Sequence, residues 1–321
     1  PWAGNYFPMA NGGIASRWQT GSYPQTTLDQ TKSLAEIKAM TPAEIALLSP
    51  VEKYDLFVGN YDFKATKYEL EHRGPLRRPK PQGWEGFCNG ARCAGGLLPE
   101  PLIPVTVTNR DGMVITFQPA DLKALGSASY FYVEKYAAIG SPATRDLKDR
   151  PNAGVFDVAL RYFIGELKRP FIIDAHLGTE IWNESVVGYT RTIKSETTVT
   201  AAEAQEVRGA VKKIEVELLL NVLGEMSISR SNQPTKALVS SGAVTERMNT
   251  SYTLFVDAQD RVLEGKWSNA PGTHGVDFAW FGAGKGADAD PRIGNGNRAL
   301  GFKDIDMLFK KAARASCEAM F

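Results

Sequence analysis

Patterns typical of helices dominate the first 140 residues. Thr-Pro-Ala-Glu at residues 41–44 and Ser-Pro-Val-Glu at residues 49–52 share one arrangement. Ser or Thr as N-cap, Pro at the first helical position and Glu at the third are signals of a helix start. We expect further helices over residues 88–98, 119–125 and 130–138, with a β-hairpin over residues 105–117.

Strand-like patterns dominate the second half. Residues 170–174 form a short apolar run that ends in Asp174. Apolar and polar residues alternate over 187–199 and again over 207–226, which predicts two strands because side chains along a strand point to opposite faces in turn. Residues 251–267 predict a hairpin whose turn lies at 257–261.

Two apolar segments complete the pattern. Residues 156–164 fit a buried strand or a helix, and periodicity does not distinguish them. Residues 302–320 have the apolar spacing of an amphipathic helix. A helical half followed by a half rich in antiparallel strands indicates an α+β fold. We expect one domain over residues 1–321, with a mainly helical lobe over 1–140 and a strand-rich lobe over 141–321.

The composition excludes two classes of partner. Hydrophobic residues make up 43% and charged residues 23% of the 321 residues, and the formal net charge is +1. A charge so close to zero provides no field that would attract nucleic acid. No stretch reaches the roughly 18 consecutive apolar residues that span a bilayer. We therefore expect no nucleic-acid partner and no membrane span.

Three cysteines, Cys88, Cys93 and Cys317, make an odd count. In an oxidising compartment the natural division is a Cys93–Cys317 disulfide with Cys88 left as the thiol. In a reducing compartment all three remain thiols, and the sequence leaves both alternatives open. The chain begins at Pro1 and shows no signal peptide, so we expect any such peptide to lie outside this sequence.

The stretch around Cys88 is the strongest candidate for chemistry. It reads Gly-Trp-Glu-Gly-Phe-Cys-Asn-Gly-Ala over residues 83–91, which places the cysteine after a glycine-containing turn and at the start of a predicted helix. A tight turn exposes the sulfur, and a helix N-terminus favours the reactive thiolate. Cys88 is therefore a candidate nucleophile. The alternative is a buried cysteine that acts as a small hydrophobic residue.

Several motifs, in order along nearly the whole chain, resemble the transglutaminase elicitor family of oomycete cell walls and their bacterial relatives. The most specific is Ile-Trp-Asn-Glu-Ser-Val-Val-Gly-Tyr at residues 181–189, which departs from the family's elicitor peptide at Glu184 and Ser185. The other similar motifs are Cys-Asn-Gly-Ala at 88–91, Pro-Glu-Pro at 99–101, Gly-Lys-Trp at 265–267 and His-Gly-Val-Asp-Phe-Ala-Trp at 274–280.

The resemblance implies a papain-like cysteine-enzyme fold and transglutaminase activity. Family members join a glutamine side chain to an amine through a thioester, so Cys88 would attack the glutamine carboxamide and a lysine amine or water would resolve the acyl-enzyme. The resemblance also implies protein or peptide substrates that carry Gln and Lys. It further implies a secreted or periplasmic location. We expect Trp84, Asn89 and Trp182 to contact the substrate. Calcium dependence is reported within the family, and calcium is the cofactor that the resemblance suggests.

The expected catalytic base is the point at which this chain departs from the family. The family's Phe-His element falls on Phe156 and Asp157, 69 residues after Cys88. A carboxylate with a pKa of about 3.9 is a weak base at neutral pH. His274, in a family-like His-x-x-Asp-Phe stretch, is the alternative base, and Asp174 is the expected carboxylate that orients it.

The remaining candidates have simpler interpretations. His72 lies among charged residues and is expected to be solvated, while His176, two residues beyond Asp174, is expected to be structural. Residues 288–297 supply Asp and Asn oxygens of the kind that calcium binds. Their spacing is not that of an EF-hand, so from the residues themselves we expect no metal site.

Two other classes of function stay open. One is a catalytically impaired homologue that acts as a secreted binding or cell-surface protein, which Asp157, Arg92 and Cys93 motivate because they depart from the expected pattern. The other is a structural cell-surface protein with an ordinary disulfide. A histidine within hydrogen-bonding reach of Cys88 supports the enzyme, whereas a disulfide at Cys88 supports the structural protein.

Overall fold

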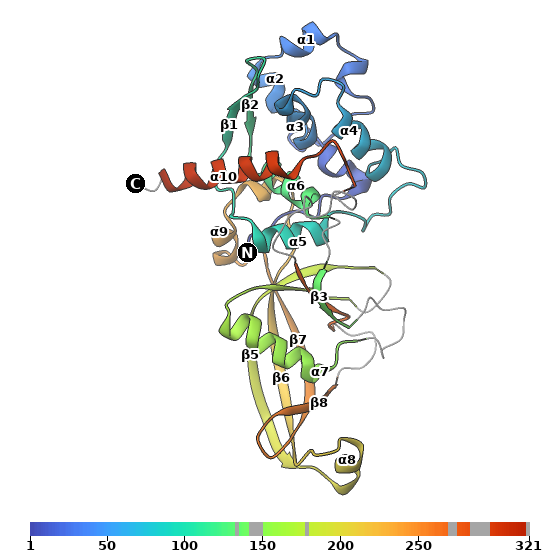
Figure 1. Ribbon diagram of the computed structural model, residues 1–321, viewed down its shortest axis with the longest axis vertical. Coiled ribbons are helices and arrows are strands. Elements are labelled where there is room, and N and C mark those ends of the chain that lie inside the picture. Colours follow the sequence, from blue (N-terminus) through green and yellow to red (C-terminus); the bar gives the residue numbers. More distant parts are fainter. Residues whose placement is uncertain (132–134, 141–149, 177–179, 269–274, 283–295, 319–321) are drawn as a thin grey trace. The chain divides into compact units, whose positions relative to one another are not determined.

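The structure is a computed structural model of the chain, shown in Figure 1. Two compact units make up the chain, each assembled from separate segments. Unit 1 comprises Pro1–Glu134, Glu225–Val244 and Ala283–Phe321, and unit 2 comprises Lys135–Gly224 and Thr245–Gly282. The structure describes residues 1–131, 135–140, 150–176, 180–268, 275–282 and 296–318, with only the backbone at 135, 136 and 316–318.

Unit 1 is built mainly of short helices. Ser33, Thr41 and Ser49 each begin a helix with a capping box, in which the hydroxyl accepts the N–H of a Glu three residues on. Within the described residues its α-helices are α1 (Leu34–Lys38), α2 (Pro42–Ala46), α3 (Pro50–Val58), α4 (Lys64–Tyr68), α5 (Cys88–Leu97), α6 (Pro119–Ser129), α9 (Thr235–Ser240) and α10 (Phe302–Glu318). Its shorter elements are η1 (Met9–Asn11), η2 (Gly13–Ala15), η3 (Leu28–Gln30), η4 (Glu69–Arg73), η7 (Ser229–Asn232) and the hairpin of β1 (Val105–Thr108) and β2 (Val114–Phe117).

The N-terminal residues of unit 1 form an aromatic arm packed into its core. Trp2 and Phe7 are 2% and 1% exposed. The main chain of the arm bonds to α5 and to the loop before it, through Trp2 N–H to Gly95 O at 3.0 Å and Met9 N–H to Glu85 O at 2.9 Å. The arm therefore fixes both ends of the segment that carries Cys88.

A fully buried ion pair joins α3 to α6. Lys53 Nζ lies 2.7 Å from Asp121 Oδ2, and neither side chain is exposed. Asp121 also accepts hydrogen bonds from Trp18 Nε1 at 2.8 Å and from the Gln118 N–H at 2.8 Å. Several donors on one carboxylate offset the cost of taking both charges out of water. The pair therefore fixes how α3 lies against α6.

Unit 2 is a twisted antiparallel sheet with α7 (Ala153–Leu160) on one face. Within the described residues the sheet has seven strands in the order β3-β9-β4-β5-β6-β7-β8, and Figure 1 shows α7 crossing its long strands. The elements of unit 2 are β3 (Lys135–Ile139), α7, η6 (Arg161–Glu166), β4 (Phe171–Asp174), β5 (Asn183–Thr198), α8 (Ala201–Glu206), β6 (Lys212–Leu223), β7 (Thr245–Val256), β8 (Val262–Trp267) and β9 (Ala279–Gly282).

The core of unit 2 lies between α7 and the sheet. Alternate residues of β6, from Val216 to Val222, are buried with Phe156 and Leu160 of α7. α7 begins directly against β8, because a Cβ added at Gly265 would lie 2.0 Å from the Gly154 nitrogen. The opposite face of β5, β6 and β7 carries their intervening, more polar residues.

The α+β class is confirmed, whereas the prediction for residues 130–138 is wrong. Tyr130 caps the end of α6, and residues 135–139 are strand β3, paired with β9. Residues 156–164, left open between strand and helix, are helical in α7 and η6. The expected boundary near residue 140 differs from the two units, because α9 and α10 belong to the helical unit. The papain-like assignment stays a prediction.

The described helices include none that combines the length and apolar character needed to cross a membrane.

Gly90 provides a test of how closely α5 approaches α6. A Cβ at this position would lie 2.0 Å from the Ser127 carbonyl oxygen, so Gly90→Ala must push the helices apart. We expect the free energy of unfolding in urea to fall by at least about 2 kcal/mol, as in overpacked cores. Gly83→Ala is the control, because nothing lies within 4 Å of its added methyl, and it should change stability by less than about 0.5 kcal/mol. Equal effects of the two variants would contradict this packing.

Candidate active site

Cys88 is the first residue of α5 and is half-buried. The residue before it, Phe87, is fully buried, and its ring lies 4.9 Å from that of Phe131. The turn needs glycine at Gly86, because a Cβ there would lie 2.6 Å from the Tyr6 carbonyl oxygen. The aromatic anchor and the tight turn together hold the sulfur at the start of the helix.

A buried guanidinium stabilises the aromatic anchor. Arg73 is 3% exposed, and its guanidinium carbon lies 5.5 Å from the ring centre of Phe87 and 5.0 Å from that of Phe131. Arg73 Nη1 also pairs with Glu69 Oε1 at 3.1 Å. A cation over aromatic faces is attracted by their negative electrostatic potential. Arg73 therefore supports the turn from which Cys88 emerges.

Asn89 uses its side chain to organise the beginning of α5. Its amide nitrogen donates to the Phe131 carbonyl at 2.7 Å, and its oxygen accepts the Gly90 N–H at 2.8 Å. These bonds tie the first helical turn to the end of α6. The predicted contact between Asn89 and substrate stays a prediction, and the described role of its amide is structural.

A charged pair lies one helical turn beyond Cys88. Arg92 is 2% exposed, and its guanidinium donates to Glu225 Oε1 at 3.4 Å and to the Gly4 carbonyl at 3.5 Å. Residues four apart lie on the same face of a helix. Burial, then Glu225 and then Cys88 raise the pKa of Tyr6. Cys88, Arg92, Glu225 and Tyr6 thus share one electrostatic neighbourhood within unit 1.

Cys93 differs sharply from Cys88 although both lie on α5. It is 2% exposed, and burial raises the pKa of its thiol to about 12. It takes no part in a disulfide, so the predicted Cys93–Cys317 bridge is not formed; the side chain of Cys317 lies outside the described residues. Enclosure in the core explains why Cys93 behaves as a small hydrophobic residue.

Trp84 lies in a loop that is held by an ion pair. Glu85 accepts two hydrogen bonds from Arg77, each of 2.7 Å, and one from the Gln82 N–H at 2.6 Å. Trp84 itself is half-buried. Its indole therefore belongs to an ordered loop close in sequence to Cys88, and its contact with substrate stays a prediction.

In unit 2, Asp174 organises the loop that follows β4. It is fully buried, and its Oδ1 accepts the N–H of Trp182 at 3.0 Å and of His176 at 3.2 Å. The rings of His176 and Trp182 lie 6.2 Å apart. In the next residue, Asn183 Oδ1 accepts Trp280 Nε1 at 2.8 Å. The structure therefore brings together Asp174, Trp182 and a histidine for which the sequence predicted only a structural role.

The three histidines are in different situations. His72 is exposed and stacks on Tyr68, with ring centres 4.3 Å apart. His176 is exposed beside the buried Asp174. His274, the predicted base, lies outside the described residues.

Comparison with known proteins decides the family. A family model described as "Transglutaminase elicitor" matches residues 79–317. The chain belongs to the transglutaminase elicitor family. Its structure is similar to the crystal structure of the GP42 transglutaminase from Phytophthora sojae, with a TM-score of 0.68 and 23% identity over 98% of this chain and 90% of that chain. At this identity the likeness shows a common fold. A search of curated proteins returned no match.

Asp157, where the resemblance to the transglutaminase elicitor family places a histidine, is the centre of a buried ion-pair network. Its Oδ1 accepts from Arg191 Nε at 2.7 Å and from the Tyr252 hydroxyl at 2.6 Å, and its Oδ2 accepts from Arg161 Nε at 2.8 Å. Burial and then Asp157 raise the pKa of Tyr252, which keeps its phenol a donor. Donors thus occupy both oxygens of Asp157, and the carboxylate is held in place by three side chains.

Calcium finds no evident site in the part of the chain that is described. No group of three or more His, Cys, Asp or Glu side chains there could hold a metal ion. Residues 288–295 of the oxygen-rich loop lie outside the described residues, and Asn297 Oδ1 accepts the Ala299 N–H at 3.1 Å. The described carboxylates therefore do not gather into a set that fits a calcium ion.

Some members of the site have no signal in the local sequence. Glu225 lies 133 positions from Arg92, and no sequence pattern around either residue predicts this ion pair. Tyr6 belongs to the N-terminal arm, far from Cys88 in the sequence. Glu225 and Tyr6 become neighbours of Cys88 through tertiary packing alone.

Asp157→Asn distinguishes a structural carboxylate from a catalytic one. We expect the free energy of unfolding in urea to fall by about 1.5–3 kcal/mol, because the buried carboxylate loses its charged hydrogen bonds to Arg191 and Arg161, whose guanidinium groups keep some contact with water. Asp62→Asn is the control, since Asp62 forms a solvent-exposed pair with Lys64, and its effect should stay below about 1 kcal/mol. A variant at Asp157 that is as stable as the parent but has lost acyl transfer would point instead to a base.

The charges next to Cys88 predict opposite effects on its alkylation. Arg92→Met removes a positive charge and should raise the midpoint of the iodoacetamide pH profile by about 0.5–1 unit, because nearby cations favour the thiolate. Glu225→Gln removes a negative charge and should lower the midpoint. Mass spectrometry assigns the label to Cys88, and Arg92→Lys should restore the parent profile. Shifts of the same sign in Arg92→Met and Glu225→Gln would exclude this electrostatic role.

Proposed function

We propose that the protein is a protein-glutamine acyltransferase in which Cys88 is the nucleophile. The observation that carries the proposal is the position of Cys88, half-buried at the first residue of α5 and anchored by Phe87, in a chain of the transglutaminase elicitor family. The positive end of a helix stabilises a thiolate. The substrates are proteins or peptides that carry glutamine and lysine.

The chemistry has two stages. The Cys88 thiolate attacks the glutamine carboxamide carbon, forming a C–S bond and an oxyanion, which in this proposal backbone N–H groups at the start of α5 stabilise. The C–N bond then breaks, and the nitrogen takes a proton and leaves as ammonia. An amine or water attacks the thioester and loses a proton, and the C–S bond breaks to release the isopeptide or acid with the thiolate.

The proposed base is a histidine with Asp174 as its orienting carboxylate. His274 is the residue that the sequence predicts, and His176 enters because its backbone is bonded to Asp174. Asp157 is the weakest of the predicted catalytic residues, since two arginines and a tyrosine occupy its oxygens. A papain-like arrangement, action outside the cytoplasm and any need for calcium remain predictions from the family.

A catalytically impaired homologue that binds without catalysis is the second candidate function. The observation that favours it is the ion-pair network of Asp157. This residue is expected to align with the family's histidine, and in this chain it pairs with Arg161 and Arg191. Such a protein would keep the fold and the Trp182–Asn183 stretch while lacking turnover.

Incorporation of dansylcadaverine into dimethylcasein tests the enzyme. Cys88→Ala should abolish incorporation, while Cys93→Ala, which alters a buried thiol, should stay within about twofold. His274→Gln and His176→Gln identify the base, because loss of a general base costs about 100-fold or more; His72→Gln is the control. The parent protein could instead be folded, incorporate no amine and have a Cys88 that is alkylated no faster than an ordinary thiol. That result would contradict the acyltransferase and favour the binding homologue.

A further inference from the structure

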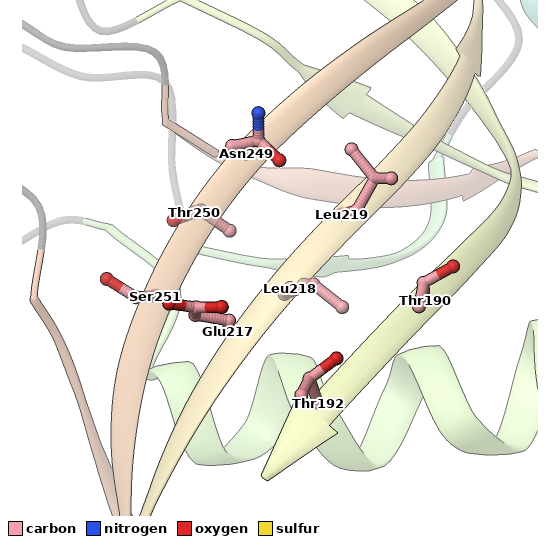
Figure 2. Close-up of a pocket in the computed structure, with 8 residues that line it drawn as sticks. All are labelled: Thr190, Thr192, Glu217, Leu218, Leu219, Asn249, Thr250 and Ser251. Atoms are coloured by element: carbon pink, nitrogen blue, oxygen red, sulfur yellow. The ribbon is translucent and has the colours of Figure 1, made fainter. Parts of the chain in front are cut away.

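A groove of about 570 Å³ lies on the face of β5, β6 and β7, within unit 2. Figure 2 shows the residues that line it, which come from all three strands. Hydroxyl, amide and carboxylate groups predominate, with two leucines among them. The lining residues are Thr190, Thr192, Glu217, Leu218, Leu219, Asn249, Thr250 and Ser251.

The strand register arranges these side chains in two rows. Glu217 of β6 lies opposite Thr192 of β5 and Ser251 of β7. Two residues along, Leu219 lies opposite Thr190 and Asn249 in the same way. Residues two apart on a strand share a face, so the rows are adjacent. One row presents a carboxylate between two hydroxyls, and the next presents an apolar leucine between two polar side chains.

An ammonium group already occupies one oxygen of the carboxylate. Lys194 Nζ lies 3.1 Å from Glu217 Oε2, and the two side chains are 52% and 60% exposed. An exposed ion pair of this kind contributes little to stability, so an incoming ammonium group can displace Lys194 at small cost. Lys194 comes from the neighbouring strand and demonstrates the charge and group that the Glu217 row accepts.

We propose that this groove binds the side chain of a lysine in an extended polypeptide, and that it anchors a polypeptide substrate through a lysine other than the one that donates its amine. The ammonium group pairs with Glu217 between the hydroxyls of Thr192 and Ser251. The aliphatic stem lies on Leu219, because lysine buries its methylenes on apolar surface while the charge stays in polar surroundings. Thr190 and Asn249 are placed to bond the neighbouring backbone. The inference rests on the proposed acyl transfer.

Binding can be measured without turnover in the full chain carrying Cys88→Ala. The probe is a capped pentapeptide with a central lysine, titrated while the methyl signals of Leu218 and Leu219 are followed by NMR. The comparison is the same peptide with Nε-acetyl-lysine. We expect the lysine peptide to bind about three- to fivefold more tightly, with the difference shrinking as salt is added. Equal binding of the two peptides would overturn the proposal, and so would binding that leaves the methyl signals of Leu218 and Leu219 unchanged.

Two substitutions with matched controls locate the contact. Glu217→Gln should weaken the lysine peptide about three- to fivefold, the range of an exposed ion pair. Glu215→Gln, on the same face of β6 but bonded to Thr253 outside the groove lining, should leave binding unchanged. Lys194→Ala should strengthen binding about twofold because it removes the internal competitor. Lys212→Ala, whose partners are Glu196 and Asp260, controls for loss of a surface cation.

The outcomes separate this inference from the proposed function. Weakening by Glu217→Gln together with strengthening by Lys194→Ala supports the groove, whether or not the parent protein transfers acyl groups. Equal effects of Glu217→Gln and Glu215→Gln overturn the groove while leaving Cys88 catalysis intact. Circular dichroism of each variant establishes that the fold is retained.

Discussion

The region around Cys88 depends on backbone lying directly against backbone. At Gly86, Gly90 and Gly95 a methyl group would collide with main-chain oxygen atoms of Tyr6, Ser127 and Trp2. The helix that Cys88 opens is consequently located by main-chain atoms, which cannot adjust as side-chain rotamers do. Phe87, buried under Arg73, sets the direction from which the chain enters the helix. A nucleophile held by rigid surroundings satisfies the main geometric requirement of a reacting group.

Electrostatics gives two cysteines on one helix opposite characters. Cys93 faces the core, where a thiolate would lack solvation, and its thiol stays protonated. Cys88 lies at the positive end of the same helix, one turn from a buried guanidinium. Elsewhere the buried charges Lys53, Asp121 and Asp157 are all paired, and they specify how the elements fit. Ionisable side chains therefore have two kinds of position in this chain. The enclosed ones hold the elements together, and the half-buried Cys88 is accessible to solvent.

Local signals in the sequence predicted much of the fold. The capping boxes at Thr41 and Ser49 are contained in a few consecutive residues, and the alternation over β6 reports one buried face. The prediction failed at β3, whose apolar residues fit either period and whose partner β9 is distant in the sequence. The positions of Cys88 at the start of a helix and of Asp174 at the end of a strand were predictable, and their catalytic roles stay predictions. The pairing of Arg92 with Glu225 and the enclosure of Cys93 arise from tertiary contacts that no local pattern encodes.

The discontinuity of unit 1 has a consequence for biosynthesis. The helix with Cys88 emerges from the ribosome well before Glu225, and before α10, whose Phe309 packs against Gly126 and stacks with Trp2. Unit 2 comes from chain segments lying between these parts, so the helical unit closes only after the segments of unit 2 have been made. Contacts between distant segments are slow to form, and a nascent chain folds as its domains become available. The order of synthesis thus delays the packing around Cys88 until segments on both sides of unit 2 are present.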